Sequence, residues 1–134
     1  MTAASSPQTP HGASRDPARP VAVSSETVSV EAFAALDLRI GTVRSAEPNP
    51  KARKPAYVLR IDFGPRGVLT SSAQITDRYA PAELVGRQVV AVVNLPPKRV
   101  AGVKSEALLL GAVEETGVTL LRPDAATPNG TSVA

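Results

Sequence analysis

Residues 88–111 read QVVAVVNLPPKRVAGVKSEALLLG, in which two apolar runs flank a basic segment. Every residue from Val89 to Val93 is apolar, and so is every residue from Ala107 to Leu110. Short apolar runs bounded by turn residues are typical of strands that are buried on both faces. The stretch therefore predicts a β protein in which two buried strands hold the segment between them.

The segment between the two apolar runs combines turn residues with positive charge. Pro96 and Pro97 fix φ, whereas Gly102 relaxes it, so a loop here can keep a set shape. The loop presents three cations, which are Lys98, Arg99 and Lys104. Such a loop suits the binding of a polyanion, and it offers no evident means of making or breaking bonds.

The β pattern continues through the rest of the chain. Tyr57, Leu59, Ile61 and Phe63 alternate with more polar residues, as in a half-buried strand. Further strands are expected within 38–47, 68–75 and 118–123, and a short helical crossing within 76–86. Five or six short strands with glycine at the bends indicate an all-β, five-stranded barrel of the OB type, with the crossing between its third and fourth strands. Periodicity alone does not separate this barrel from other small barrels.

The start of the folded part is also visible in the sequence. Residues 1–28 are rich in Ser, Ala, Pro and Thr, so we expect a disordered tail there and one domain at 29–134. The only histidine, His11, is then a solvated tail residue. A short helix is expected after Ser29, which is a suitable N-cap. Gly41 stands where the apolar pattern changes face, which favours a strand bulge or a barrel bend.

Charge is distributed unevenly along the chain. The net charge is only +3, but residues 39–104 hold twelve Lys and Arg against four Asp and Glu, an excess of eight. In a small domain this excess favours an anionic partner over ordinary surface scatter.

Residue types that support chemistry are missing from the sequence. The chain has no cysteine, which removes disulfides and thiolate sites, and His11 is the only base of the kind that a Ser-His-Asp triad needs. We therefore expect a protein that is not an enzyme and that uses no metal and no cofactor. No apolar run approaches the roughly 20 residues of a membrane span. Without a secretory signal either, the sequence favours the cytoplasm and no membrane insertion.

Aromatic residues refine the expected ligand. The four rings are Phe33, Tyr57, Phe63 and Tyr79, and the strand pattern assigns Tyr57 and Phe63 to the core. Too few rings remain for a platform that stacks single-stranded bases. We therefore expect contacts to phosphates and 2′-hydroxyls of a folded RNA, recognised mainly by its shape.

The candidate RNA-binding residues differ in how strongly the sequence supports them. For Lys98, Arg99 and Lys104, function is favoured over a solvated loop. For a second basic loop the two interpretations are balanced. Three single residues complete the set, and each has a structural alternative. Arg39 can form an ion pair with Asp37, whereas Asn94 and Ser105 can satisfy backbone groups. The second loop contributes Lys51, Arg53 and Lys54, and the single residues are Arg39, Asn94 and Ser105. Glu106 is expected to order a neighbouring cation.

Five stretches together resemble the bacterial CsaA family, relatives of the tRNA-binding domain appended to methionyl-tRNA synthetases. The Ser-Ser-Ala-Gln-Ile block and the Asn-x-Pro-Pro-x-Arg block are specific in combination, and the resemblance covers about residues 30 to 134. The matching stretches are LDLRIGTV at 36–43, SSAQIT at 71–76 with Tyr79, VVAVVN at 89–94, residues 96–111, and Pro-Asn-Gly at 128–130.

This resemblance implies an OB-fold homodimer that binds tRNA and also acts as an export-related chaperone. It places the loop from Pro96 to Ser105, and the region of Arg39, on the RNA-facing surface. As a chaperone, the protein would have unfolded preproteins or the export machinery as partners and would need an exposed apolar groove. A trans-acting cofactor for a synthetase is a further possibility. The apolar runs exceed what one small barrel needs, which independently favours a homodimer.

Overall fold

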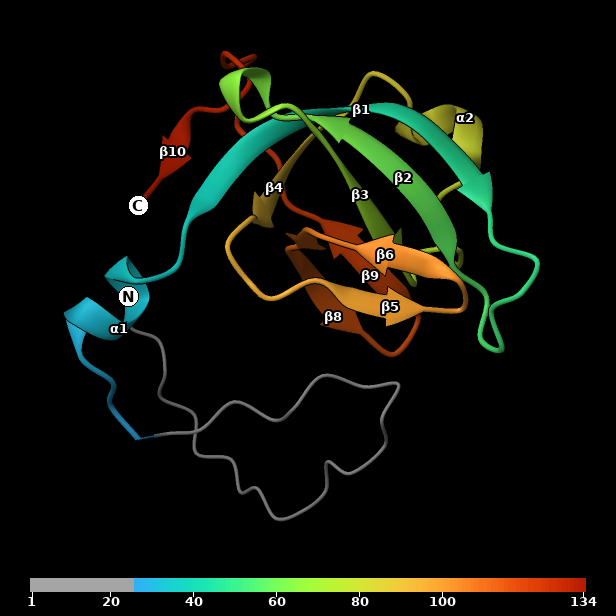
Figure 1. Cartoon of the computed structure of the whole chain (residues 1–134), viewed down its shortest axis with the longest axis horizontal. Coiled ribbons are helices and arrows are strands. Elements are labelled where there is room, and N and C mark those ends of the chain that lie inside the picture. The colour runs from blue at the N-terminus through green and yellow to red at the C-terminus, as the bar shows by residue number, and fades with distance from the viewer. Residues whose placement is uncertain (1–25) are drawn as a thin grey trace. The chain divides into compact units, whose positions relative to one another are not determined.

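The computed structural model of the protein describes residues 26–134. The expected disordered tail, with His11, lies outside these residues apart from positions 26–28. Residues Ala34–Ala134 form one compact unit. Figure 1 shows the elements, which are α1 Val30–Ala34, β1 Leu38–Pro48, β2 Tyr57–Asp62, the 3-10 helix η2 Gly64–Arg66, β3 Val68–Ala73, α2 Pro81–Leu84, β4 Gln88–Val92, β5 Lys98–Val100, β6 Val103–Ser105, β7 Leu108–Leu109, β8 Gly111–Glu114, β9 Gly117–Leu120 and β10 Ser132–Val133.

The two short α-helices lie where the sequence predicts them. Helix α1 begins after Ser29, whose side-chain Oγ accepts a hydrogen bond from the Ala32 N–H at 3.0 Å. This bond satisfies one of the N–H groups that a helix start leaves free. Helix α2 falls between β3 and β4, as expected for the crossing. Among residues 26–134 no helix has the length and apolar character to cross a membrane.

The main sheet is antiparallel and curls into a nearly closed barrel. Its strand order is β3-β2-β1-β4-β7, and β10 pairs with the start of β1. The segment after β6 closes the gap toward β3, where the Glu106 N–H donates to the Thr70 carbonyl at 2.7 Å. The prediction of an all-β, OB-like barrel is confirmed. Figure 1 shows β1 and β2 as long curved strands, with the smaller β5–β6 and β8–β9 hairpins beside them.

The alternating strand supplies the centre of the core. Leu59, Ile61 and Phe63 are completely buried and Tyr57 is 7% exposed, while Arg60 faces solvent. This confirms the period-two pattern of the sequence. These side chains pack with Val43, Leu84 and Val89 from β1, α2 and β4 in a single cluster.

Gly41 is not the site of the strand bulge that its position suggested. It pairs in regular register with Val89, and the bulge lies three residues later at Arg44, between Val43 and Ser45. A Cβ at Gly41 would lie 2.7 Å from the Ile61 Cγ2 and from two ring carbons of Phe63. Glycine is needed here because two core side chains pack against the strand backbone.

The two apolar runs behave differently. Val89, Val90, Ala91 and Val92 are all buried, so β4 is covered on both faces as predicted. The prediction is wrong for the second run, in which Leu108 is 55% exposed and only Ala107 is fully buried.

The Pro-Asn-Gly stretch near the C-terminus joins β1 and β4. The Asn129 Oδ1 accepts hydrogen bonds from the Thr42 hydroxyl at 2.7 Å and from the Gln88 amide at 3.1 Å. The Gly130 N–H donates to the Ile40 carbonyl at 2.7 Å, and the Ile40 N–H donates to the Thr131 carbonyl. This segment therefore holds the edge of β1 that β2 does not reach.

Candidate nucleic-acid interface

The central basic segment is a β-hairpin rather than an irregular loop. Strands β5 and β6 pair Val100 with Val103, so Ala101 and Gly102 alone form the turn. Both residues have positive φ, 47° and 84° respectively. Two successive residues with positive φ are the mark of a type I′ turn, whose twist matches that of paired strands. The turn therefore fixes the position of the cations on the two strands.

Arg99 and Lys104 lie directly opposite each other on this hairpin, and both are exposed. The Arg99 guanidinium donates to the Gly102 carbonyl at 3.2 Å, which orients it along the hairpin. Like charges opposite each other in a sheet are destabilising. Two cations in this arrangement create a site of positive potential with a fixed geometry.

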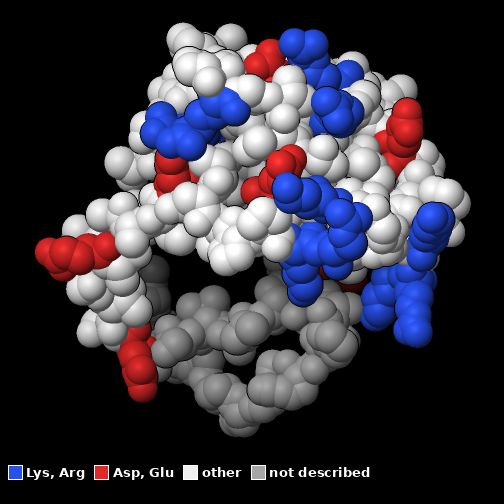
Figure 2. Space-filling model, in the orientation of Figure 1, with Lys and Arg blue, Asp and Glu red and all other residues white. Residues whose placement is uncertain are grey.

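The second basic loop lies against the tip of the hairpin. The Asn49 amide donates to the Ala101 carbonyl at 3.3 Å, and its Oδ1 accepts from the Lys51 N–H. A Cβ built on Gly102 would lie 3.7 Å from the Lys51 Cδ. Segments about fifty residues apart in the sequence thus contribute to one surface. Figure 2 shows Lys and Arg gathered over the β5–β6 hairpin and, beside it, over the loop after β1.

The cations of the hairpin and the loop differ from other cations of the barrel in that they form no ion pairs among the described residues. The four ion pairs among the described residues use Arg39, Arg44, Arg66 and Arg78. The six cations of the hairpin and the loop take part in none of these pairs, and all six side chains are exposed. Their charge is therefore available to an external anion. We call this set the basic surface: Lys51, Arg53, Lys54, Lys98, Arg99 and Lys104.

The other three candidate residues have intramolecular partners. The Arg39 Nε donates to the Asp37 carboxylate at 2.6 Å, and its Nη1 donates to the Gly130 carbonyl at 3.0 Å. The Asn94 Oδ1 accepts from the Asp37 N–H, and the Asn94 amide donates to the Ala35 carbonyl, both at 2.9 Å. Ser105 Oγ accepts from the Ser72 N–H at 3.0 Å. These contacts match the structural alternatives, and a contact to RNA stays a prediction for each residue.

Glu106 does not order a neighbouring cation. Its carboxylate accepts the Thr70 N–H at 2.9 Å and so anchors the base of the hairpin to β3. The bonds that Ser105 and Glu106 accept from β3 hold the short hairpin in a fixed position on the barrel.

The rings that the sequence assigned to the core are indeed unavailable for stacking. Tyr57 and Phe63 belong to the buried cluster. Tyr79 is half-buried, its hydroxyl accepts the Leu120 N–H at 2.9 Å, and the Arg87 guanidinium lies 5.1 Å from its ring centre. The described part of the barrel, Ala34–Ala134, therefore has no free aromatic platform.

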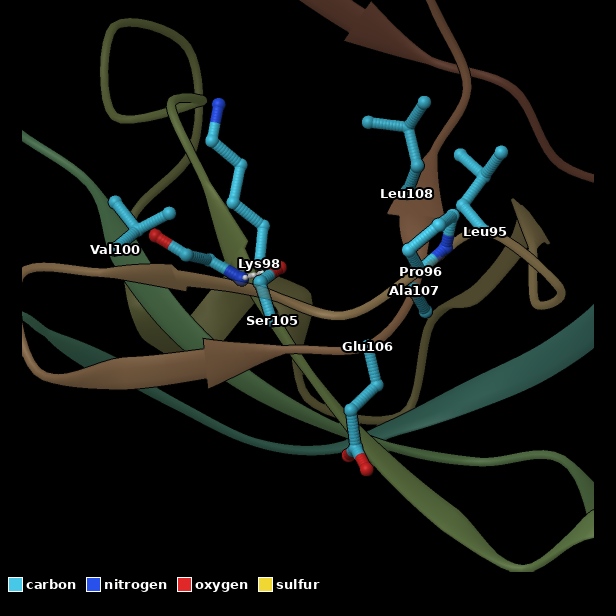
Figure 3. A pocket seen from close by; sticks show the side chains of 9 residues that line it. Leu95, Pro96, Lys98, Val100, Ser105, Glu106, Ala107 and Leu108 are labelled. Carbon is cyan, nitrogen blue, oxygen red and sulfur yellow. Dashed lines mark hydrogen bonds between the residues drawn. The ribbon is translucent and has the colours of Figure 1, made fainter.

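The sequence did not reveal an apolar cavity of about 300 Å³ beside the hairpin. Strand alternation places Lys98 and Val100 on this side, away from the face that carries Arg99. Figure 3 shows the Lys98 stem on one side of the cavity, and Leu95, Pro96 and Leu108 on the other. Its walls come from three separate segments, so no single stretch of sequence signals it.

The ionisable side chains near this interface bear on whether it can hold a metal ion. Across residues 26–134, no group of three His, Cys, Asp or Glu side chains is placed to hold a metal ion. The pKa of the Asp62 carboxyl, on β2, is displaced. The Gly64 N–H, and after it the Arg44 guanidinium, lower the pKa of Asp62 below its ordinary value of 3.8. This carboxylate stays ionised and acts as a hydrogen-bond acceptor.

Comparison with known proteins identifies the family of the chain. Residues 38–132 match the family described as a putative tRNA-binding domain. The match covers most of the chain, and the protein belongs to this family of tRNA-binding domains.

Within this family the chain is CsaA-like. It shares 56% identity and a TM-score of 0.78 with the chaperone CsaA of Bacillus anthracis, covering 81% of this chain and 100% of that one. The CsaA chaperone protein of Picrophilus torridus is 42% identical, with a TM-score of 0.76 and coverage of 81% and 100%. The methionine–tRNA ligase of Flavobacterium johnsoniae is 37% identical over 109 residues, which are 81% of this chain and 15% of the ligase. The chain thus spans only about a seventh of that enzyme's length.

Proposed function

We propose that this chain binds folded tRNA without catalysis, and that the basic surface makes the contact. Membership of the tRNA-binding domain family supports the class of ligand. The observation that carries the proposal is the pairing of Arg99 with Lys104 on a hairpin whose tip lies against Lys51. This arrangement sets several cations without carboxylate partners at fixed spacing, which suits the phosphates of an RNA backbone.

The mode of recognition follows from what surrounds the cations. The core tyrosine and phenylalanine are buried, so extended stacking on rings is not available to this barrel. A rigid hairpin and a loop joined to it present charges at set distances, and such an array distinguishes RNA by shape. Cytoplasm is the compartment in which we place this activity, since tRNA is the ligand.

We propose in addition that the protein acts as a homodimer. Val68, Val85 and Val113 are 37%, 51% and 55% exposed. Exposed large apolar side chains in a small barrel favour burial against a second copy. Two copies would join two basic surfaces into one two-fold surface. A monomeric mass in light scattering at micromolar concentration would rule out the dimer.

The test of tRNA binding compares ligands and charge variants. The unmodified protein should bind tRNA more tightly than duplex DNA or unstructured single-stranded RNA over a salt series. The double variant R99A/K104A should bind tRNA more weakly, with a slope of log K against log salt that is smaller by about 1.4 to 1.8, because two phosphate contacts are lost. The matched control R60A/R122A removes the same charge from two exposed arginines outside the basic surface and should keep the slope. An unchanged slope in R99A/K104A would show that the hairpin does not contact tRNA.

A second candidate function is that of an export-related chaperone for unfolded preprotein segments. The open apolar cavity favours it, because such a protein needs an apolar groove. The two solved relatives described above are CsaA chaperones. Suppression of aggregation that persists in R99A/K104A would support this candidate, whereas loss of suppression together with tRNA binding would assign both effects to the charges.

A further inference from the structure

The cavity lies on the opposite side of the hairpin from the Arg99–Lys104 pair. Its volume of about 300 Å³ is at the small end of ligand-sized cavities, and its walls are mainly aliphatic. It opens next to an ammonium group, since the Lys98 stem forms part of its lining. An occupant should therefore be small and apolar on its faces and should carry negative charge where it leaves the cavity.

The local charge narrows the choice of occupant. Lys98 is the one cation among the residues that line the cavity, because Arg99 and Lys104 lie on the opposite face of the hairpin. Glu106 also lines the cavity, but its carboxylate is bonded to the Thr70 N–H, and Figure 3 shows it pointing away from Leu95, Pro96 and Leu108. The Lys98 ammonium thus supplies one positive charge beside the cavity, which complements a single phosphate.

We propose that this cavity takes one unpaired nucleobase of the bound RNA, while Lys98 contacts the adjoining phosphate. The proposal rests on the proposed function and deepens it. A base offers two flat, weakly polar faces to the aliphatic walls of Leu95, Pro96 and Leu108, and its sugar-phosphate leaves toward the Lys98 Nζ. Splayed, unpaired bases are the parts of a folded RNA that a protein pocket can accept. The hairpin then recognises RNA on both faces, phosphates on one and a base on the other.

The test compares two RNA stems that differ only in a single-stranded end. The unmodified protein should bind the stem with the unpaired end about fivefold or more tightly than the blunt stem, in line with the lower values for base contacts. L108A removes one wall and should abolish this difference while leaving the salt slope unchanged. The matched control L121A removes a comparably exposed leucine outside the cavity and should keep the difference. L108W, which fills the cavity, should act like L108A.

The opposing outcomes are distinct. Equal binding of the two stems by the unmodified protein, or an equal loss in L121A, overturns the base site while tRNA binding stands. A halved mass of L108A in light scattering assigns the cavity to a second copy, and displacement of the unpaired end by an apolar peptide assigns it to a protein partner. Failure of the unmodified protein to bind tRNA or either stem overturns the proposed function itself. Thermal unfolding of both leucine variants checks that each is folded.

Discussion

Arg99 and Lys104 face each other across two strands of three residues each, with their charges unshielded by any carboxylate in the described ion pairs. Cross-strand pairs of like charge lower the stability of a sheet by roughly 0.2–1 kcal/mol. The pair therefore lowers the stability of the hairpin but raises the positive electrostatic potential at its surface.

The hairpin should become more stable when one of the two charges is removed. K104T replaces the lysine with a residue that favours strands and leaves the Arg99 bond to the Gly102 carbonyl intact. We expect the free energy of unfolding to rise by about 0.2–1 kcal/mol, while tRNA affinity falls. Urea unfolding and a binding titration on the same sample check the two effects. A loss of stability in K104T would show that the pair carries no repulsion.

The hairpin turn should respond to substitution according to its backbone angles. Ala101 has a φ of 47° and Gly102 a φ of 84°, and Asn-Gly is the preferred pair for this turn. A101N should raise the free energy of unfolding by up to about 1 kcal/mol, and G102A should lower it by about 1–2 kcal/mol. Thermal unfolding measures both. The same sign for the two variants would contradict the turn type.

The core should not accept a methyl group at position 41. G41A brings a Cβ within 2.7 Å of Ile61 and Phe63, both completely buried. Overpacking of this kind should lower the free energy of unfolding by about 1–3 kcal/mol. Chemical denaturation checks it, and because Gly41 lies in the core, the salt slope of tRNA binding should remain that of the unmodified protein. Full stability in G41A would show that the side chains of Ile61 and Phe63 can move away to admit a methyl group.

Asn94 should stabilise the fold and should not contact RNA. N94A removes the acceptor of the Asp37 N–H and the donor to the Ala35 carbonyl, and should lower the free energy of unfolding by about 1 kcal/mol. The salt dependence of tRNA binding should not change. A reduced slope with unchanged stability would instead place Asn94 at the RNA.

Asp62 should contribute stability that depends on pH. The pKa of its carboxyl is lowered in the folded chain, chiefly by the Gly64 N–H and then by the Arg44 guanidinium. Its stabilising contribution is therefore present above the ordinary value of 3.8 and is lost as the pH falls through the lower, folded value. D62N should unfold at a lower temperature than the unmodified protein at neutral pH, and the two curves should converge in acid. A constant difference between them down to strongly acidic pH would contradict this account.

The sequence predicted the parts of the fold that depend on local pattern. The alternation around Leu59 and the continuous run in β4 correspond to real strands because burial repeats along the chain itself. It missed the β5–β6 hairpin, since its strands are three residues long and an Ala-Gly turn is a weak signal beside two prolines.

The charged residues of the candidate site could be predicted from the sequence, but the contacts that hold them in place could not. The cations Lys98, Arg99 and Lys104 stand close together in the sequence, and all three are exposed, as a surface that binds a polyanion requires. By contrast, Ser105 and Glu106 bond to backbone groups of β3, 33 and 36 residues away. The contact of Lys51 with the hairpin tip and the cavity beside Lys98 likewise arise only when distant segments meet.

The bonds made by Asn129 and Gly130 bear on the order of events when the chain folds. They join positions 87 and 91 residues apart, such as Thr42 with Asn129 and Arg39 with Gly130. Contacts of such separation require the largest loops to close and form slowly, whereas a hairpin with a two-residue turn forms in microseconds. We therefore expect the basic hairpin to form early and the contacts of Asn129 and Gly130 with β1 to form last. A nascent chain would then present cations to nearby RNA before its barrel is complete.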